Sequence, residues 1–340
     1  MKVWKSPGVI GVTVLVAIIL IVPTLIVIPF IGKYDAAVEV GNVSKQPLVQ
    51  NEAEGPAVEV VVHRAKTKQQ ESVPLEDYVS RVVASEMPAD FELEALKAQS
   101  LAARTYIIKH LLNGDALPSG ADVTDTVEHQ VYKNDKELRS LWGSDYEWKM
   151  EKIQQAVAAT KGEVLTFEGE PITAAFFSTS NGETENAEDY WETPYPYLTS
   201  VSSPWDESSP KYHDQKVFTR AQIEERLGVQ VTDSQPAFSE PVKTSTNRIK
   251  TVKVAGKDFT GRGIREALEL QSADFTVVEK NGHYIFQTKG YGHGVGMSQY
   301  GANGMAQEGK TYDEIVSHFY QGTDVLQVSD FLPKLTASKE

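Results

Sequence analysis

The sequence predicts an α+β fold, in which helices and antiparallel strands surround a substrate groove, preceded by one N-terminal transmembrane helix. Helical periodicity dominates residues 74–159, and strand-like runs dominate the chain after residue 162. Strands and helices do not alternate regularly, so a parallel βαβ sheet is not expected. No repeat of fixed period is present, which argues against a solenoid.

An uncharged apolar segment occupies residues 8–32 near the start of the chain. In a helix, at about 1.5 Å per residue, it is longer than the roughly 30 Å hydrocarbon core of a bilayer. It is also too long for the apolar part of a cleaved signal peptide and lacks a small-residue cleavage motif. We therefore expect a membrane anchor. Lys2 and Lys5 place residues 1–7 in the cytoplasm, and the rest of the chain outside the membrane.

Residues 33–56 are rich in small and polar side chains without an apolar period, so they are expected to form a tether to a folded domain over residues 57–340. The formal net charge of −14 makes nucleic acid an unexpected partner, because phosphate binding requires clustered Lys and Arg. The chain contains no cysteine, which excludes disulfides and thiolate metal sites.

The folded domain is expected to begin with a strand in residues 57–64. A helix should start near Pro74 and end at Glu86, and a second should run from Asp90, its expected N-cap, to Gly114. An aromatic helix is expected near residues 137–159. Strands are then expected in residues 162–169, 172–180 and 248–256, and in a hairpin over 275–290 that turns at Asn281-Gly282.

The stretch GMAQEGKT, residues 304–311, matches the phosphate-loop pattern G-x-x-x-x-G-K-[ST]. A phosphate loop must follow a buried strand, and the glycine-rich residues before this stretch do not read as one. Thr311 and Glu314 form a capping box for the next helix, which explains the threonine without a magnesium ion. Gly309 would end the preceding segment, and Lys310 is expected to be solvated. We therefore do not expect an ATPase.

Glu86 is the most informative carboxylate. The apolar stripe of its helix runs through Leu75, Val79 and Val82, and the next position on that face is Glu86. Partial burial and the negative end of the helix dipole both favour a protonated carboxyl, as a general acid requires. An ion pair with Arg81 or with the next helix explains the residue equally well.

The second helix carries two polar pairs with a spacing of seven residues. Lys97 and Arg104 share one face, and Gln99 and Tyr106 share another that could line a groove. Solvated surface charges and a half-exposed helix face are the alternative interpretations.

Ser178, Ser180 and Asn181 end an apolar strand and precede an aromatic-rich segment. Aromatic planes beside hydroxyl and amide groups suit sugar rings, although a small core that anchors a loop has the same composition.

His293 lies in GYGHGVGMSQYGANG, in which the glycines indicate sharp bends or close approach of the backbone, and Gln299 and Tyr300 follow it. The other histidines are scattered and show no metal-ligand spacing, so no metal or cofactor is expected. There is no G-x-S-x-G motif, which disfavours a serine hydrolase.

Three segments in order, SEMPADFELEALKAQSLAARTY, FFSTSNGETENAEDYW and GYGHGVGMSQYGANGMAQEGKTYDEIVSHFY, resemble the stage II sporulation protein D family over roughly residues 57–327. The resemblance implies a peptidoglycan lytic transglycosylase of spore-forming bacteria, which acts between mother cell and forespore during engulfment. Glu86 matches the family's S-E-M-P glutamate, which implies that it is the catalytic acid and base. A lytic transglycosylase needs one such carboxylate, whereas an ordinary glycosidase needs two.

The implied partners are denuded glycan strands, a sporulation cell-wall amidase and a membrane partner of the engulfment complex. Some relatives bind zinc near the segment that corresponds to VEHQVYKN, where this chain has only His129 and no cysteine. The family also resembles amidase-enhancer proteins, so a noncatalytic module that binds glycan and stimulates an amidase is the alternative function.

Overall fold

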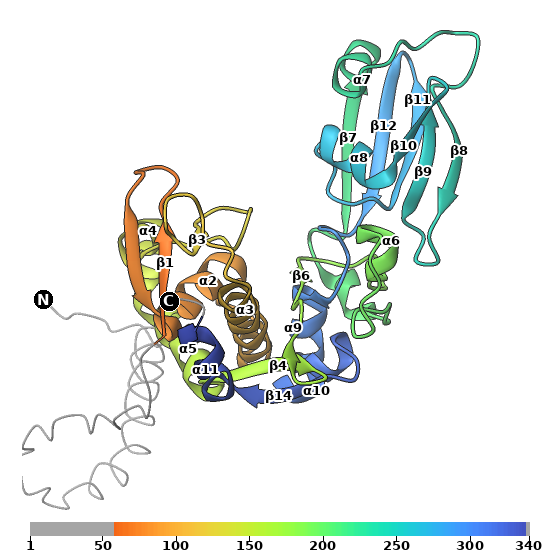
Figure 1. Ribbon diagram of the computed structural model, residues 1–340. Coiled ribbons are helices and arrows are strands. Elements are labelled where there is room, and N and C mark those ends of the chain that lie inside the picture. The colour runs from red at the N-terminus through yellow and green to blue at the C-terminus, as the bar shows by residue number, and fades with distance from the viewer. Residues whose placement is uncertain (1–57, 338–340) are drawn as a thin grey trace, which may run out of the picture. The chain divides into compact units, whose positions relative to one another are not determined.

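The computed structural model describes residues 58–337, which belong to one unit that extends over Gly55–Glu340 (Figure 1). The expected cytoplasmic end, membrane span and tether, residues 1–56, lie outside the described residues. Within residues 58–337, no helix combines the length and apolar character that crossing a bilayer requires. The described residues mix helices with mostly antiparallel strands, which confirms the α+β prediction for this part of the chain.

The N-terminal part packs a small sheet against three helices. Strand β1 (Glu59–His63) pairs with β2 (Gln70–Pro74) and, in parallel, with β3 (Val123–Thr124). Helices α2 (Leu75–Glu86), α3 (Leu93–Asn113) and α5 (Tyr146–Ala159) contact one another. Their buried side chains form one core, which includes Tyr78, Leu96 and Ile153. The first helix carries Glu76 and Asp77 in its first turn and ends at Glu86, as predicted.

Helix α3 also contacts a second core on its other side. That core contains Ala95, Ala98 and Ala102, and strand β4 (Glu163–Phe167) lies against the helix (Figure 1). Strand β4 pairs with β5 (Glu170–Pro171) and β14 (Asp324–Gln327), while α9 (Gln299–Gln307) and α10 (Tyr312–Phe319) pack nearby. The alanines allow this close approach, so α3 is buried on nearly every side.

Residues 213–289 form two three-stranded sheets with a core of their own. One sheet has the order β11-β12-β7 and the other β10-β9-β8. Within the first sheet, the Phe286 ring packs edge-to-face on the Phe218 ring, with a centroid distance of 5.6 Å. The predicted hairpin is confirmed: Lys280 pairs with His283, and the turn residues have φ angles of 53° and 73°. The element bounds are β7 (His213–Thr219), α7 (Arg220–Leu227), β8 (Phe238–Lys243), β9 (Ile249–Val254), β10 (Lys257–Thr260), α8 (Gly261–Ala267), β11 (Phe275–Lys280) and β12 (His283–Lys289).

The remaining elements are short. Strands β6 (Phe176–Phe177) and β13 (Met297–Ser298) pair in parallel and join two distant parts of the sequence. The others are α4 (Asp135–Trp142), η1 (Gly143–Asp145), α6 (Ala187–Trp191), η2 (Pro204–Ser208), η3 (Val328–Phe331) and α11 (Leu332–Ala337).

Three predicted boundaries were wrong. The N-cap of α3 is Glu92 rather than Asp90, because residues 88–91 form a turn in which the Phe91 N–H donates to the Pro88 carbonyl. The aromatic helix is interrupted at Gly143, which has a φ of 54°. Of the strand predicted in residues 172–180, only Phe176–Phe177 is regular, and Thr179 pairs with Tyr291 of the glycine-rich loop through a single bridge.

Candidate active-site cleft

A cleft of about 700 Å³ opens at the C-terminal end of α2 and is called here the Glu86 cleft. Segments far apart in the sequence line it: the end of α2, residues 176–178, the loop around residue 292 and the start of α9. Five of the predicted site residues lie there, namely Glu86, Ser178, His293, Gln299 and Tyr300. The structure thus brings the sequence motifs that contain Glu86 and His293 to one site.

Glu86 is half-buried at the last position of its helix. The backbone N–H of Val131 donates to Oε1 at 3.0 Å. Burial raises the pKa of Glu86, and this effect outweighs the Val131 hydrogen bond and the charge of Lys133, which both lower it. The carboxyl therefore holds a proton at a higher pH than an exposed glutamate does.

The alternative that Glu86 forms an ion pair is not what the structure shows. Arg81 instead contacts Glu71 at 3.3 Å and Asp135 at 3.1 Å. No Lys, Arg or His nitrogen within residues 58–337 lies at ion-pair distance from the Glu86 carboxyl.

Gln299 joins the glycine-rich segment to the end of helix α2. Its Nε2 donates to the backbone carbonyl of Glu86 at 3.2 Å and to Oε1 of Gln99 at 3.3 Å. Gln99 is fully buried behind the cleft, so it supports the wall and does not line it. The two amides hold the free carbonyl end of α2, and with it the position of Glu86.

Ser178 and Tyr300 are connected through the main chain. The Ser178 carbonyl accepts hydrogen bonds from the Tyr300 N–H at 3.1 Å and from the Ser298 hydroxyl at 3.3 Å. The Tyr300 ring packs edge-to-face on Phe91 at a centroid distance of 4.9 Å. This side of the cleft is therefore built on β6, β13 and the start of α9.

His293 is held by close packing of the glycine-rich backbone. A Cβ on Gly296 would lie 2.1 Å from the Ala175 carbonyl oxygen, and a Cβ on Gly294 would lie 2.7 Å from the Arg248 guanidinium. Both glycines have positive φ, of 80° and 89°. The expected close backbone approach is confirmed, and its role is to seat His293 against the cleft wall.

The His293 ring is neutral at physiological pH. Its Nδ1 accepts a hydrogen bond from the Val295 N–H at 3.1 Å, which puts the ring proton on Nε2. Burial, with the positive charge of Arg265, lowers its pKa to about 4. The rings of Phe177, Tyr190 and Trp191 surround it at centroid distances of 5.5 to 5.8 Å. His293 therefore supplies no charge to the cleft, and its ring also forms a hydrogen bond with the backbone of Phe176.

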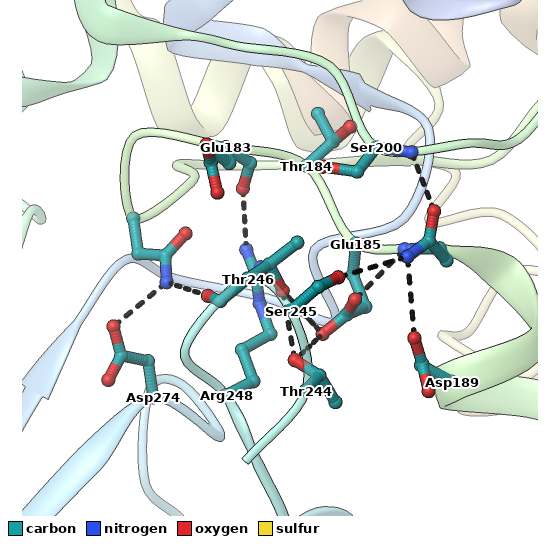
Figure 2. A network of polar contacts seen from close by, with 12 residues as sticks. Glu183, Thr184, Glu185, Asp189, Ser200, Thr244, Ser245, Thr246, Arg248 and Asp274 are labelled. Carbon is teal, nitrogen blue, oxygen red and sulfur yellow. Dashed lines mark hydrogen bonds and ion pairs between the residues drawn. The ribbon is translucent and has the colours of Figure 1, made fainter.

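A buried polar network supports this loop, as Figure 2 shows. Arg248 donates to the Glu183 carbonyl at 3.0 Å and to the Thr246 hydroxyl at 2.8 Å. The hydroxyls of Thr244 and Thr246 donate to Glu185 Oε2 at 2.8 and 2.7 Å. The backbone N–H of Glu185 donates in turn to the Gly294 carbonyl at 2.7 Å. Residues 244–248 thereby fix the backbone beside His293.

Ser180 belongs to a second buried cluster. Its hydroxyl donates to Asp206 Oδ2 at 2.6 Å, and the hydroxyls of Ser203 and Ser298 also donate to that carboxylate at 2.6 Å. Burial raises the pKa of Asp206, and the three hydroxyls oppose this effect. Ser180 is fully buried and does not reach the Glu86 cleft.

Asn181 does not line the Glu86 cleft either. Its Nδ2 donates to the Thr246 carbonyl and to Asp274 Oδ2, both at 2.8 Å. It lines a separate polar cavity of about 780 Å³ near β12, together with Lys243 and Lys289.

The predicted residues of α3 do not line the cleft. Arg104 is fully buried and pairs with Glu76 at 2.7 Å, and it is neither a solvated surface charge nor accessible to a substrate. Lys97 pairs with Glu94 at 2.6 Å. Tyr106 is half-buried and stacks on the His110 ring at 6.2 Å.

No group of three or more metal-ligating side chains occurs within residues 58–337. The His129 ring, in the segment considered for zinc from the sequence, lies 5.1 Å from the His110 ring. Its Nδ1 is occupied by the Thr124 hydroxyl at 2.9 Å.

The phosphate-loop match has the structural explanation that the sequence predicted. Thr311 and Glu314 form a capping box at the start of α10, and Gly309, with a φ of 85°, follows the end of α9. Lys310 pairs with Glu314 at 2.8 Å on the surface.

Comparisons with known proteins identify the family of the chain. The family model described as Stage II sporulation protein matches residues 63–167. The chain is 48% identical to Stage II sporulation protein D of Bacillus subtilis (strain 168) over 335 residues, which cover 96% of this chain and 98% of the relative. It is 46% identical to Stage II sporulation protein D of Bacillus amyloliquefaciens over 96% of this chain and 97% of the relative.

A more distant relative has a different name. The Amidase enhancer of Bacillus subtilis (strain 168) is 29% identical over 300 residues, which cover 71% of this chain and 39% of that protein. The near full-length identity to the two sporulation proteins decides the assignment: the chain belongs to the stage II sporulation protein D family.

Proposed function

We propose that this protein is a membrane-anchored lytic transglycosylase that cleaves peptidoglycan glycan strands during engulfment. The bond cleaved joins N-acetylmuramic acid to N-acetylglucosamine, and the product carries a 1,6-anhydro end. The observation that carries the proposal is Glu86, a half-buried carboxyl with a raised pKa that opens into a cleft of about 700 Å³. Such a carboxyl keeps its proton to a higher pH than an exposed glutamate does, so it can donate a proton and take one back.

The reaction uses the free oxygen of Glu86. Oε1 accepts the Val131 hydrogen bond, so the proton is carried by Oε2. Oε2–H protonates the bridging oxygen as the bond from that oxygen to the anomeric carbon breaks. The resulting carboxylate then removes the proton of the muramic acid 6-hydroxyl, whose oxygen attacks the anomeric carbon. Protons balance, and no water is consumed.

Asp90 is the other carboxylate that lines the cleft, and it is exposed. A hydrolase with two carboxylates would need it to activate water or to attack the sugar. The exposed position favours the single-carboxylate mechanism, because no ion pair within residues 58–337 holds the Asp90 carboxylate in a fixed orientation.

The remaining features of the proposal are the anchor in residues 8–32, an extracytoplasmic domain, and association with a cell-wall amidase and a membrane partner. The uncharged sequence of residues 8–32 supports the anchor. The similarity to a protein named Amidase enhancer supports a relation to an amidase, and it also supplies the competing function, a glycan-binding module without activity of its own.

The test is to incubate the full-length protein in detergent micelles with denuded glycan strands and analyse the products by mass spectrometry. We expect shorter strands with 1,6-anhydro-N-acetylmuramic acid ends, and no cleavage by Glu86→Gln. If the wild-type protein instead produces reducing ends, and Asp90→Asn produces none, the protein is a hydrolase. Intact strands, together with faster turnover by an added amidase, would identify an enhancer.

A further inference from the structure

One arginine differs from every other arginine in the described residues. All the others in residues 58–337 have a carboxylate oxygen within ion-pair distance, including the fully buried Arg104 and Arg248. Arg265 has none, yet it is half-buried and lines the Glu86 cleft. In a chain with a net charge of −14, such a cation has many potential partners and is paired with none of them.

The backbone fixes Arg265 at the edge of the His293 loop. Its Nε donates to the Gln271 carbonyl at 3.1 Å, and the same carbonyl accepts a hydrogen bond from the Gly292 N–H at 3.0 Å. The guanidinium is therefore oriented by one nitrogen, while no hydrogen bond within the described residues occupies Nη1 or Nη2. Those two nitrogens are the pair that binds a carboxylate in the bidentate geometry.

A second cation lines the same cleft. Lys211 has its Nζ 5.0 Å from the centre of the Tyr291 ring and has no carboxylate at ion-pair distance within residues 58–337. The third cleft cation, Lys149, differs because it contacts Asp145 at 3.5 Å. The cleft thus offers two positive groups that the protein itself leaves unneutralised.

The glycan has one matching group. N-acetylmuramic acid carries a lactyl substituent, which is a free carboxylate after the stem peptide has been removed and a neutral amide while the peptide is attached. We propose that Arg265, assisted by Lys211, binds this free lactyl carboxylate and is the residue by which the cleft distinguishes a free lactyl carboxylate from an amide. This inference rests on the proposed function for the identity of the substrate.

The selectivity has a simple electrostatic cause. A carboxylate can accept both Nη hydrogen bonds and neutralises the guanidinium, whereas an amide has one carbonyl oxygen and no charge. A glycan that still carries its peptides would leave Arg265 partly desolvated without a counter-charge, which is unfavourable.

The test compares two forms of one glycan. Denuded strands of defined length are used directly or after their lactyl carboxylates have been converted to N-methylamides, which removes the charge and adds little bulk. Binding is measured by calorimetry with full-length protein in micelles, carrying Glu86→Gln so that no strand is cut. We expect at least about 10-fold tighter binding of the free acid, a ratio that decreases with added salt.

The additional substitution Arg265→Gln should remove most of this ratio, mainly by weakening the binding of the free acid, and Arg265→Lys should restore part of it. The matched control is Arg262→Gln, three residues earlier on α8, whose side chain pairs with Glu266 at 2.8 Å and does not line the cleft. This control should keep the full ratio. Lys211→Gln should lower the ratio less than Arg265→Gln does.

The inference is overturned if the parent protein binds both glycans equally, or if Arg265→Gln weakens both by the same factor in a protein with unchanged melting temperature. The binding ratio does not depend on catalysis. A normal ratio in a protein that never cleaves glycan would therefore refute the proposed function and leave this inference standing.

Discussion

The backbone N–H of Val131 donates to Oε1 of Glu86 at 3.0 Å, although the two residues lie 45 positions apart. Val131 belongs to the segment VEHQVYKN, residues 127–134. In this chain the segment holds the carboxyl through the main chain. The bond leaves Oε2 to carry the exchangeable proton and fixes the direction in which it is presented.

The pH dependence of cleavage is the first prediction. Because burial raises the pKa of Glu86, its acid form persists above its ordinary value of 4.5, and kcat/KM should fall as the pH rises through the raised pKa. His293, with a pKa of about 4, stays neutral over this range and does not contribute. The measurement is the pH profile on a glycan of fixed length. A profile that rises through the same range would assign Glu86 as a base in the free enzyme.

Arg104→Met tests the buried ion pair. Arg104 also donates hydrogen bonds to the Thr160 hydroxyl and to the carbonyls of Val157 and Glu163, and each of these groups would lose one donor. We expect a loss of about 3 kcal/mol in the free energy of unfolding. Denaturant unfolding measures it, with Arg139→Met, an exposed residue, as the control. The activity per folded molecule should be unchanged. A loss of kcat at full folding would show that Arg104 contributes to the active site.

These contacts show which features the sequence could predict. Glu86 was identifiable because it interrupts an apolar stripe, and the His293 loop because of its glycines. The burial of Arg104 could not be predicted, because helical periodicity does not distinguish a solvated arginine from one that is buried between two cores. Arg248 and Glu185 gave no local signal, since their contacts join residues about sixty positions apart.

Gly296→Ala is predicted to damage the site through the backbone. A Cβ there would lie 2.1 Å from the Ala175 carbonyl at a φ of 80°, so the β6–β13 contact must open. We expect the free energy of unfolding to fall by about 3 kcal/mol or more, together with loss of glycan cleavage. Gly309→Ala is the matched control, because its φ is 85° but nothing lies within 4 Å of the added Cβ. Gly309→Ala should lower the free energy of unfolding by about 1 kcal/mol and leave glycan cleavage intact. Equal losses in the two variants would show that φ alone matters.

Lys310→Ala is predicted to have no effect on cleavage, and the protein should not hydrolyse ATP. The lysine forms only an exposed pair with Glu314, and the Thr311 hydroxyl is used for capping. Phosphate release from ATP and cleavage of glycan by the variant are the two measurements. ATP turnover that disappears in Lys310→Ala would contradict the capping interpretation.

Glu86→Gln should increase stability while it removes activity. An acid whose pKa is raised on folding binds more protons in the folded than in the unfolded state, so wild-type stability falls as the pH rises from 4.5 through the raised pKa. Glutamine has no charge to bury, and its Oε1 can still accept the Val131 hydrogen bond. The variant should therefore melt at a higher temperature than the wild type at pH 7, and the difference should vanish below pH 4.5, where both side chains are neutral.

The activity of the same variant should fall by about 10²-fold or more, because the amide cannot donate and recover a proton. Melting curves at several pH values and glycan cleavage at one pH provide the two measurements, with Asp90→Asn as a control for loss of a cleft carboxylate. If Glu86 were instead held as a stabilising carboxylate, its replacement would lower the melting temperature at pH 7, and the lost activity would follow the folded fraction. A more stable and inactive protein is the combination expected of a buried catalytic acid, and not of a carboxylate that stabilises the fold.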